Sequence, residues 1–267
     1  MTIMVITDKE FELFQQLIYN TAGINMAVSK KSLVNGRLAK RVKFFELDSF
    51  TEYFELLSRP NSDELQVAID LLTTNETFFF REAKHFDFLQ EKIVPSLRNQ
   101  SLRVWSAASS SGEEAYTVAM VLAAHRLNPN WEVVGTDIST RMVNKANQGQ
   151  YPIERAEKIP LHYLKKYGLK GTGAENGSFI FDSSLSSKVS FMHANLRSDL
   201  SKLGRFDVIF LRNVLIYFNL EIKQQVVDRV LRQLKPGGYL MISHTESLNE
   251  LTSDLIQVAP SIYHKKA

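Results

Sequence analysis

The sequence contains no cysteine among its 267 residues, which excludes disulfide bonds, thiolate metal sites and thiol catalysis. No apolar run reaches the length of a membrane-spanning helix. The first ten residues also lack the basic segment and apolar stretch of a secretory signal peptide. The net charge of +3 is too small to indicate nucleic-acid binding by itself. Because 44% of the residues are hydrophobic, we expect a soluble, cytoplasmic protein with a large core.

Acidic residues are missing between Thr21 and Phe45. A helix expected over residues 29–45 turns its apolar side chains toward a core and carries Lys30, Arg37 and Arg41 on its other face. A basic face of this kind is usually only solvated. Without balancing acids it also fits an acidic protein partner. Both interpretations stay open at this point.

Glycine is scarce where a dinucleotide-binding protein needs it. Residues 102–106 suit a buried strand, residues 107–112 are all small, and a helical pattern follows. Only Gly112 is a glycine, so the G-x-G-x-x-G fingerprint is absent, which disfavours a nicotinamide-dependent dehydrogenase. Glu113 and Glu114 would repel a pyrophosphate and would suit a ligand with positive charge. They equally suit ordinary first-turn acids that complement the helix dipole.

A second acid, Asp137, stands at the end of the strand expected over residues 131–136, just before a helix over residues 139–147. It follows the small-residue turn by roughly 20–30 residues, where Rossmann-like domains place the acid that binds ribose hydroxyls. The alternative is a cap for the following helix. The turn and the acid together favour an adenosine-type ligand.

The order of expected elements divides the chain into two domains. Residues 1–76 should form a helical domain, with helices near 8–20, 29–45, 49–57 and 62–72 and a possible cap at Asp8. Residues 77–267 should form an α/β domain, interrupted at about 152–190 by a small antiparallel insertion. The later expectations are strands at 189–193, 206–211 and 239–243, a helix at 220–234, a turn at 235–238, and a final strand at 257–265 with a possible break at Pro260.

Three further stretches place polar side chains where a ligand could bind. Three adjacent phenylalanines, residues 78–80, cannot all face one core, so at least one should line a cleft, and Arg81 beside them could bind an anion. Asn195 follows a strand and could bond a purine edge or serve as a turn residue. Arg212 and Asn213 follow the buried strand at 206–211, at the carboxyl edge where open α/β sheets bind ligands.

Four ordered stretches resemble the chemotaxis receptor methyltransferases, the CheR family. They are residues 73–81 (TTNETFFFR), 105–114 (WSAASSSGEE), 136–138 (TDI) and 212–218 (RNVLIYF). The resemblance covers nearly the whole chain. It implies an all-helical N-terminal domain and a Rossmann-like methyltransferase domain with a small inserted β-subdomain. It also implies S-adenosylmethionine as methyl donor and S-adenosylhomocysteine as product. The implied acceptors are receptor glutamates, whose methyl esters serve sensory adaptation.

The resemblance also implies roles for individual residues at the donor end of the cofactor. Asn75, Thr77 and Arg81 would approach its methionine end. Glu114 would meet its amino group, and Asp137 would hold the ribose.

At the other side of the expected pocket, Asn195 and Leu196 would frame the adenine. Arg212 and Asn213 would line the floor, and Tyr217 would lie near the transferred methyl. The family also uses the inserted subdomain to hold a receptor's C-terminal tether, and its basic N-terminal helix faces the acidic helical bundle of the receptor.

The implied chemistry needs neither a general base nor a metal, because a glutamate side chain is already ionised at neutral pH. Arg81 and Tyr217 are then the expected catalytic residues, which would orient the acceptor carboxylate. A nucleic-acid methyltransferase is a rival, but its Asp/Asn-Pro-Pro-Tyr run is replaced by residues 212–215 (RNVL). A scaffold that only binds the cofactor is a second rival, which the presence of Arg81 and Tyr217 disfavours.

Overall fold

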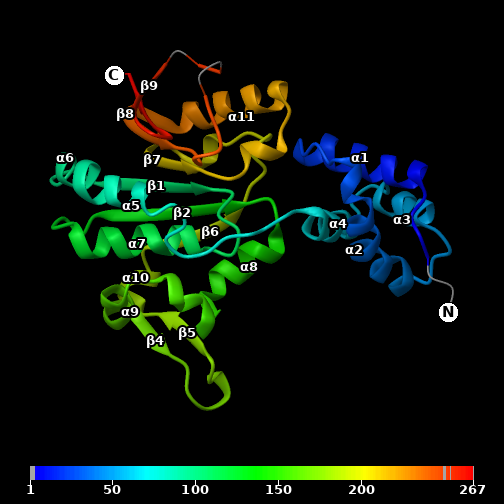
Figure 1. Ribbon diagram of the computed structural model, residues 1–267, viewed down its shortest axis with the longest axis horizontal. Coiled ribbons are helices and arrows are strands. Elements are labelled where there is room, and N and C mark those ends of the chain that lie inside the picture. The colour runs from blue at the N-terminus through cyan, green and yellow to red at the C-terminus, as the bar shows by residue number, and fades with distance from the viewer. Residues whose placement is uncertain (1–3, 249–250, 253, 267) are drawn as a thin grey trace.

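The computed structural model describes residues 4–248, 251–252 and 254–266, and Figure 1 shows two bodies joined by a connecting segment. The larger body is built on a seven-stranded sheet in the order β6-β2-β1-β7-β8-β10-β9. Neighbours from β6 to β8 are parallel, whereas β10 is antiparallel to both β8 and β9. The strand bounds, in chain order, are β1 Leu102–Ala107, β2 Trp131–Asp137, β6 Val189–His193, β7 Phe206–Leu211, β8 Leu234–Met241, β9 Leu255–Ala259 and β10 Ile262–Lys265.

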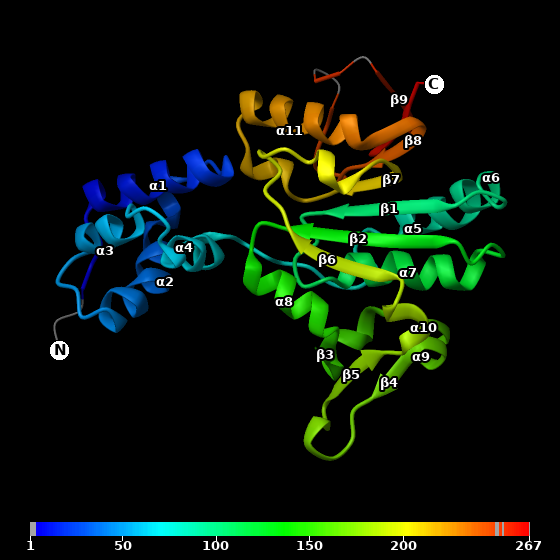
Figure 2. The same ribbon diagram turned by 180° about the vertical axis from the view of Figure 1, so that it is seen from behind.

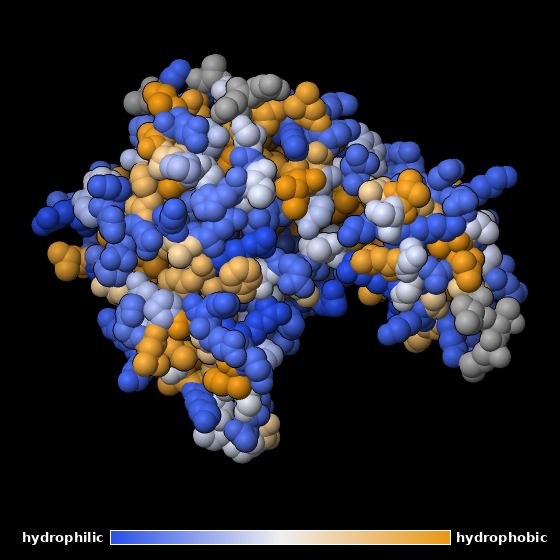
Figure 3. All heavy atoms as spheres, viewed as in Figure 1, coloured by the Kyte–Doolittle hydropathy of each residue, from blue (hydrophilic) through white to orange (hydrophobic). Residues whose placement is uncertain are grey.

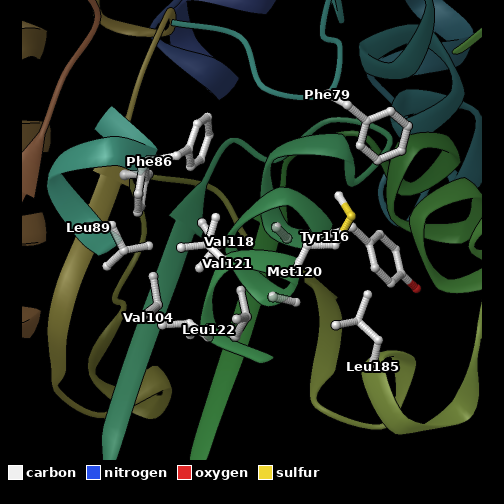
Figure 4. Packing of buried hydrophobic residues seen from close by; sticks show 14 of the residues in the cluster. Phe79, Phe86, Leu89, Val104, Tyr116, Val118, Met120, Val121, Leu122 and Leu185 are labelled. Atoms are coloured by element: carbon white, nitrogen blue, oxygen red, sulfur yellow. The ribbon is translucent and has the colours of Figure 1, made fainter. Parts of the chain in front are cut away.

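Helices cover both faces of this sheet (Figure 2), and each face buries its own apolar cluster. On one face α7 packs through Val118 and Leu122, with Phe79 and Phe86 above it (Figure 4). On the other face α11 packs through Val226 and Val230. The helices of this body are α5 Lys84–Phe88, α6 Val94–Ser96, α7 Glu113–His125, α8 Thr140–Gln148 and α11 Leu220–Gln233. The predicted Rossmann-like α/β architecture is confirmed.

The smaller body is all helical, as predicted. Its helices are α1 Asp8–Ala22, α2 Lys31–Phe44, α3 Phe50–Leu57 and α4 Asp63–Leu72, packed around their own core. The prediction of an Asp8 cap was wrong. Thr7 caps α1 and forms a capping box with Glu10, because its hydroxyl reaches the Glu10 N–H.

A three-stranded antiparallel sheet, in the order β3-β5-β4, interrupts the larger body where the insertion was predicted. Its strands are β3 Gln150–Pro152, β4 Gly168–Lys170 and β5 Ser178–Phe181, with α9 Leu161–Tyr167 before β4 and α10 Ser183–Ser186 after β5. Phe79 of the connecting segment packs against Tyr151, Phe179 and Phe181 of this subdomain. The domain division at residues 76/77 stays a prediction.

Of two expectations about the C-terminal part, the structure contradicts the first and agrees with the second. Residues 235–238 do not form a turn: they belong to β8, where a register shift against β7 accommodates Gly237 at φ 72°. The expected final strand is broken at Pro260, as proposed, and folds back as the hairpin β9–β10. Within the described residues, no helix combines the length and the apolar character needed to cross a bilayer.

Two of the three basic residues expected on the outer face of α2 have partners within the helical domain. Arg41 pairs with Glu64, whose carboxylate is nearly buried, through two bonds of 2.7 and 2.6 Å. Arg37 donates to the carbonyls of Leu71 and Thr73. Both arginines therefore hold α4 against α2, and helix periodicity alone could not show it because the partners lie 23 and more residues away. Lys30 is exposed.

Arg41→Glu should destabilise the chain, because it removes the partner of the nearly buried Glu64 carboxylate and places two carboxylates together. Removing one member of such a pair costs about 3 kcal/mol. Lys43→Glu, on the exposed side of the same helix, should change stability by no more than about 0.5 kcal/mol. Urea denaturation measures both. Similar shifts for the two variants would contradict a structural role for Arg41.

Candidate active site

A cavity lies at the carboxyl ends of β1, β2, β6 and β7, between the sheet and the helical domain. Its position follows from the strand order, because the chain moves outward in opposite directions from β1 and β7 and leaves a crevice there. The cavity is lined by every predicted site residue: Asn75, Thr77, Arg81, Glu114, Asp137, Asn195, Leu196, Arg212, Asn213 and Tyr217. The roles implied for these residues stay predictions.

The small-residue turn after β1 is bent through left-handed backbone conformations. Ala108 and Ser110 have φ values of 60° and 50°, and Gly112, which precedes α7, has φ 96°. A Cβ at Gly112 would also lie 2.9 Å from Phe191, so both the positive φ and the lack of space require glycine at this position. Such strain clusters where a turn must present its backbone to a ligand. The Ser109 hydroxyl is buried on this cavity wall with no hydrogen-bond partner among the described residues.

Asp137 fixes the shape of that turn. One of its carboxylate oxygens accepts the Ser110 N–H at 2.8 Å, and the other accepts the Ser139 N–H at 2.8 Å. Ser139 itself caps α8, so Asp137 is not the cap considered from the sequence. Burial raises the pKa of Asp137, although both N–H bonds oppose this shift. Each oxygen keeps lone pairs for hydroxyl donors brought by a ligand.

The two acids at the start of α7 have different partners, and only one of them lines the cavity. Glu113 is 1% exposed, is not among the residues that line the cavity, and pairs with Arg155 at 2.8 Å. Glu114 lines the cavity and accepts the Ser106 hydroxyl and the Arg212 guanidinium, at 2.7 and 2.8 Å. Arg212 neutralises Glu114 only in part, because its other amino group lies 3.2 Å from Glu82. A cationic group on a ligand could therefore still bind Glu114.

The connecting segment, residues 73–83, forms one wall of the cavity. Its carbonyls are held along its length: that of Asn75 by the Ser110 hydroxyl, that of Thr77 by Arg155, and that of Arg81 by Arg212. Phe79 is buried, whereas Phe78 is 43% exposed and lines the cavity. The prediction that at least one of the three phenylalanines lines a cleft is confirmed. Arg81 donates to the Glu76 carbonyl at 2.9 Å.

Asn195 holds the two bodies together at the opposite wall. Its amide nitrogen donates to the Thr21 carbonyl at 2.7 Å, and its amide oxygen accepts the Arg197 N–H at 3.0 Å. Arg197 in turn donates to the Tyr19 carbonyl at the end of α1. One amide proton and one lone pair of Asn195 remain for a ligand, so a contact to a purine edge stays a prediction.

Sequence reasoning missed two groups of residues at the site. The loop after α1 supplies Asn25 and Met26 to the cavity, and no periodic pattern marks it. Glu246 accepts the backbone N–H groups of Asn213, Ile216 and Ser243, and so shapes the loop that carries Tyr217. Glu246 was visible in the sequence as an acid three residues after Ser243, but its other partners, Asn213 and Ile216, lie 33 and 30 residues away.

The donor groups around the cavity fit S-adenosylmethionine. Glu114 suits an ammonium, Asp137 suits a pair of ribose hydroxyls, and Leu196 and Ile138 supply apolar walls for a base. The small-residue turn presents acids where a pyrophosphate would need donors, so a dinucleotide fits poorly.

Comparison with known proteins agrees with this geometry. Residues 75–263 match the family described as "CheR methyltransferase, SAM binding domain", and residues 9–73 match its all-alpha domain. The chain is 37% identical to a chemotaxis protein methyltransferase of Salmonella typhimurium, over 97% of this chain and 91% of that protein. It is 38% identical to one from Escherichia coli, over 93% and 87%. It is 36% identical to chemotaxis protein methyltransferase 2 of Pseudomonas aeruginosa, over 96% and 93%. The chain therefore belongs to the CheR methyltransferase family and carries that family's S-adenosylmethionine-binding domain.

Proposed function

We propose that this protein transfers a methyl group from S-adenosylmethionine to glutamate side chains of chemotaxis receptors and forms methyl esters. The observation that carries the proposal is that two acids, Glu114 and Asp137, line one cavity together with Arg81 and Tyr217. The acids suit the cofactor, and the arginine and the phenol suit an anionic acceptor. The names of the relatives, all chemotaxis protein methyltransferases, support a receptor as the substrate.

The cofactor would lie across the carboxyl ends of the strands. Glu114 would bind its ammonium and Asp137 its ribose, while the connecting segment closes the methionine end. The residues proposed to bind it are Asn75, Thr77, Arg81, Glu114, Asp137, Asn195, Leu196, Arg212 and Asn213. When bound, the cofactor supplies an electrophilic methyl on a sulfonium.

The acceptor needs alignment rather than activation. A glutamate carboxylate is ionised at neutral pH and attacks without losing a proton. The positive and negative charges of the reactants cancel as the methyl is transferred, so a pocket that excludes water favours the reaction. Arg81 and Tyr217 would orient the carboxylate, while the bond from Arg81 to the Glu76 carbonyl keeps the guanidinium from binding it too tightly.

Receptor contact would involve two surfaces beside the cavity. Figure 3 shows the molecule hollowed between the three-stranded sheet and the helical domain. Lys30, Lys40 and Lys43 are exposed on and beside α2 and would face acidic receptor helices. We also propose that the three-stranded sheet holds a receptor tether, because β4 and β3 are its free edges.

The direct test is transfer of tritiated methyl from S-adenosylmethionine to receptor-containing membranes, followed by mild alkali. A carboxyl ester releases volatile tritiated methanol, whereas methyl groups on nitrogen do not leave. Base-stable label on the receptor, or label on added nucleic acid alone, would overturn the proposal.

Asp137→Asn should weaken S-adenosylmethionine binding by about 10- to 100-fold, because it removes the charge from a buried hydrogen-bonding acid. Isothermal titration calorimetry measures the affinity, and thermal unfolding shows whether the turn after β1 survives. Asp199→Asn, at an exposed position, is the matched control. Unchanged affinity in a folded Asp137→Asn protein would remove Asp137 from the ribose role.

Arg81→Ala should lower turnover on the order of 100-fold, the usual effect of losing one positioned donor. Cofactor affinity should change much less, since Arg81 orients mainly the acceptor. Steady-state methylation and calorimetry give the two quantities, and Arg81→Lys tests whether charge alone is enough. Equal losses in turnover and cofactor affinity would contradict the acceptor role.

The double change Lys40→Glu and Lys43→Glu should slow receptor methylation severalfold at limiting receptor and leave cofactor binding intact. The effect should shrink at high salt, because exposed charges are screened. The control is the double change Lys92→Glu and Lys202→Glu, which alters the net charge equally at exposed positions outside α2. The same slowing in both double variants would argue against a docking surface on α2.

A further inference from the structure

Three side chains outside the cofactor cavity converge on one point. Glu82 and His85 lie at the end of the connecting segment and in α5, and His244 follows β8. One potential ligand atom from each lies within 4.8 Å of the other two. The Glu82 Oε2 atom is 3.6 Å from His85 Nδ1 and 4.0 Å from His244 Nε2. Of the residues proposed for methyl transfer, Arg81 precedes Glu82 in the chain, and Arg212 contacts the Glu82 carboxylate.

Ser261, in the turn between β9 and β10, contacts both imidazole rings. Its hydroxyl donates to the Pro260 carbonyl at 2.7 Å, which uses its only proton. The same oxygen lies 2.8 Å from His85 Nε2 and 2.8 Å from His244 Nδ1. With the Ser261 proton on the Pro260 carbonyl, this oxygen accepts from both rings, and we assign the tautomers in which each of those nitrogens carries its ring's proton. In the neutral rings, His85 Nδ1 and His244 Nε2 are therefore the bare nitrogens.

The two bare nitrogens are the ones that face Glu82. Two lone pairs and a carboxylate oxygen thus point at the same small volume, and none of them can donate to another. His85 is fully buried, and its Nδ1 atom has no hydrogen-bond partner among the described residues. An unpaired buried acceptor is costly. Arg212, 3.2 Å from Glu82, offsets the carboxylate charge but does not satisfy the imidazole.

We propose that Glu82, His85 and His244 bind a zinc ion. Two imidazoles and a carboxylate are ligands that zinc takes readily, whereas calcium and magnesium prefer oxygen alone. Tetrahedral zinc with bonds of about 2.0–2.2 Å holds its ligand atoms about 3.3–3.5 Å apart. The His85–Glu82 separation is already close to this value. His244, whose side chain is 40% exposed, can approach the ion and leave the fourth position to water.

Ser261 provides the outer support that such sites require. Metal-bound imidazoles usually donate their second N–H to a fixed acceptor, which orients the ring. Here one hydroxyl does this for both rings, from a residue whose φ of 57° is unusual for serine. A bound ion would tie together three segments that are distant in sequence: the connecting segment, the end of β8 and the β9–β10 turn.

The test uses the full chain without a polyhistidine tag, stripped with a chelator and titrated with zinc against a fluorescent zinc indicator. We expect one tight site per chain. His244→Ala should abolish it, and His162→Ala, at another exposed histidine, should not. Ser261→Ala should weaken zinc binding by about 10- to 100-fold, the usual effect of losing an outer-shell partner.

Cobalt provides a second measurement that does not depend on activity. Cobalt added to the stripped chain should give the visible absorption of a four-coordinate ion, and His244→Ala should lose it. Thermal unfolding of each variant without metal shows that the fold is retained. The proposal is overturned if the stripped chain binds no zinc at one equivalent, or if His244→Ala and His162→Ala bind it equally well.

Discussion

The buried guanidinium of Arg212 is the interaction on which the rest of the site depends. Its side chain is only 1% exposed, and it contacts Glu114, Glu82 and the Arg81 carbonyl. A charge taken out of water at this cost persists only where several partners surround it. Those partners come from α7 and from the connecting segment. Arg212 therefore holds the strand end, the acid of the cavity and the wall that closes over it in one arrangement.

The position of the helical domain is set by helix ends. Asp70 of α4 accepts the N–H groups of Thr140 and Arg141 at the start of α8. At the opposite wall, Arg197 donates to the last carbonyls of α1. Helix ends leave such groups unpaired, and here each domain satisfies those of the other. The cavity lies between these two sets of hydrogen bonds, so the bonds that fix the helical domain also fix the walls of the cavity.

This rigidity suits the proposed chemistry. A reaction that needs no proton transfer gains mainly from alignment and from the exclusion of water. Three features restrict the groups around the reacting atoms. They are the strained turn after β1, the hydrogen-bonded carbonyls of the connecting segment, and the three backbone N–H groups that donate to the Glu246 carboxylate. The zinc proposed beside Arg212 would restrain the same connecting segment from its other end.

The sequence by itself determined the elements and the outline of the site. Apolar periodicity located the helices and strands, and the rule that parallel strands share a carboxyl edge brought Glu114, Asp137, Asn195 and Arg212 together. The similarity of four motifs to a known family gave the cofactor. All of these properties depend on local pattern or on strand order, which neighbouring residues encode.

Only the tertiary structure decided which partner each polar side chain takes. Arg41, expected on a basic face, pairs with Glu64, and Glu113 and Glu114, adjacent in sequence, have different partners. The fold also brings together Glu82, His85, His244 and Ser261. These residues are spread over nearly the whole sequence of the larger body and share no motif. Hydrogen bonds and ion pairs act over a few ångströms of space, and the distance along the chain between their partners is set only by the completed fold.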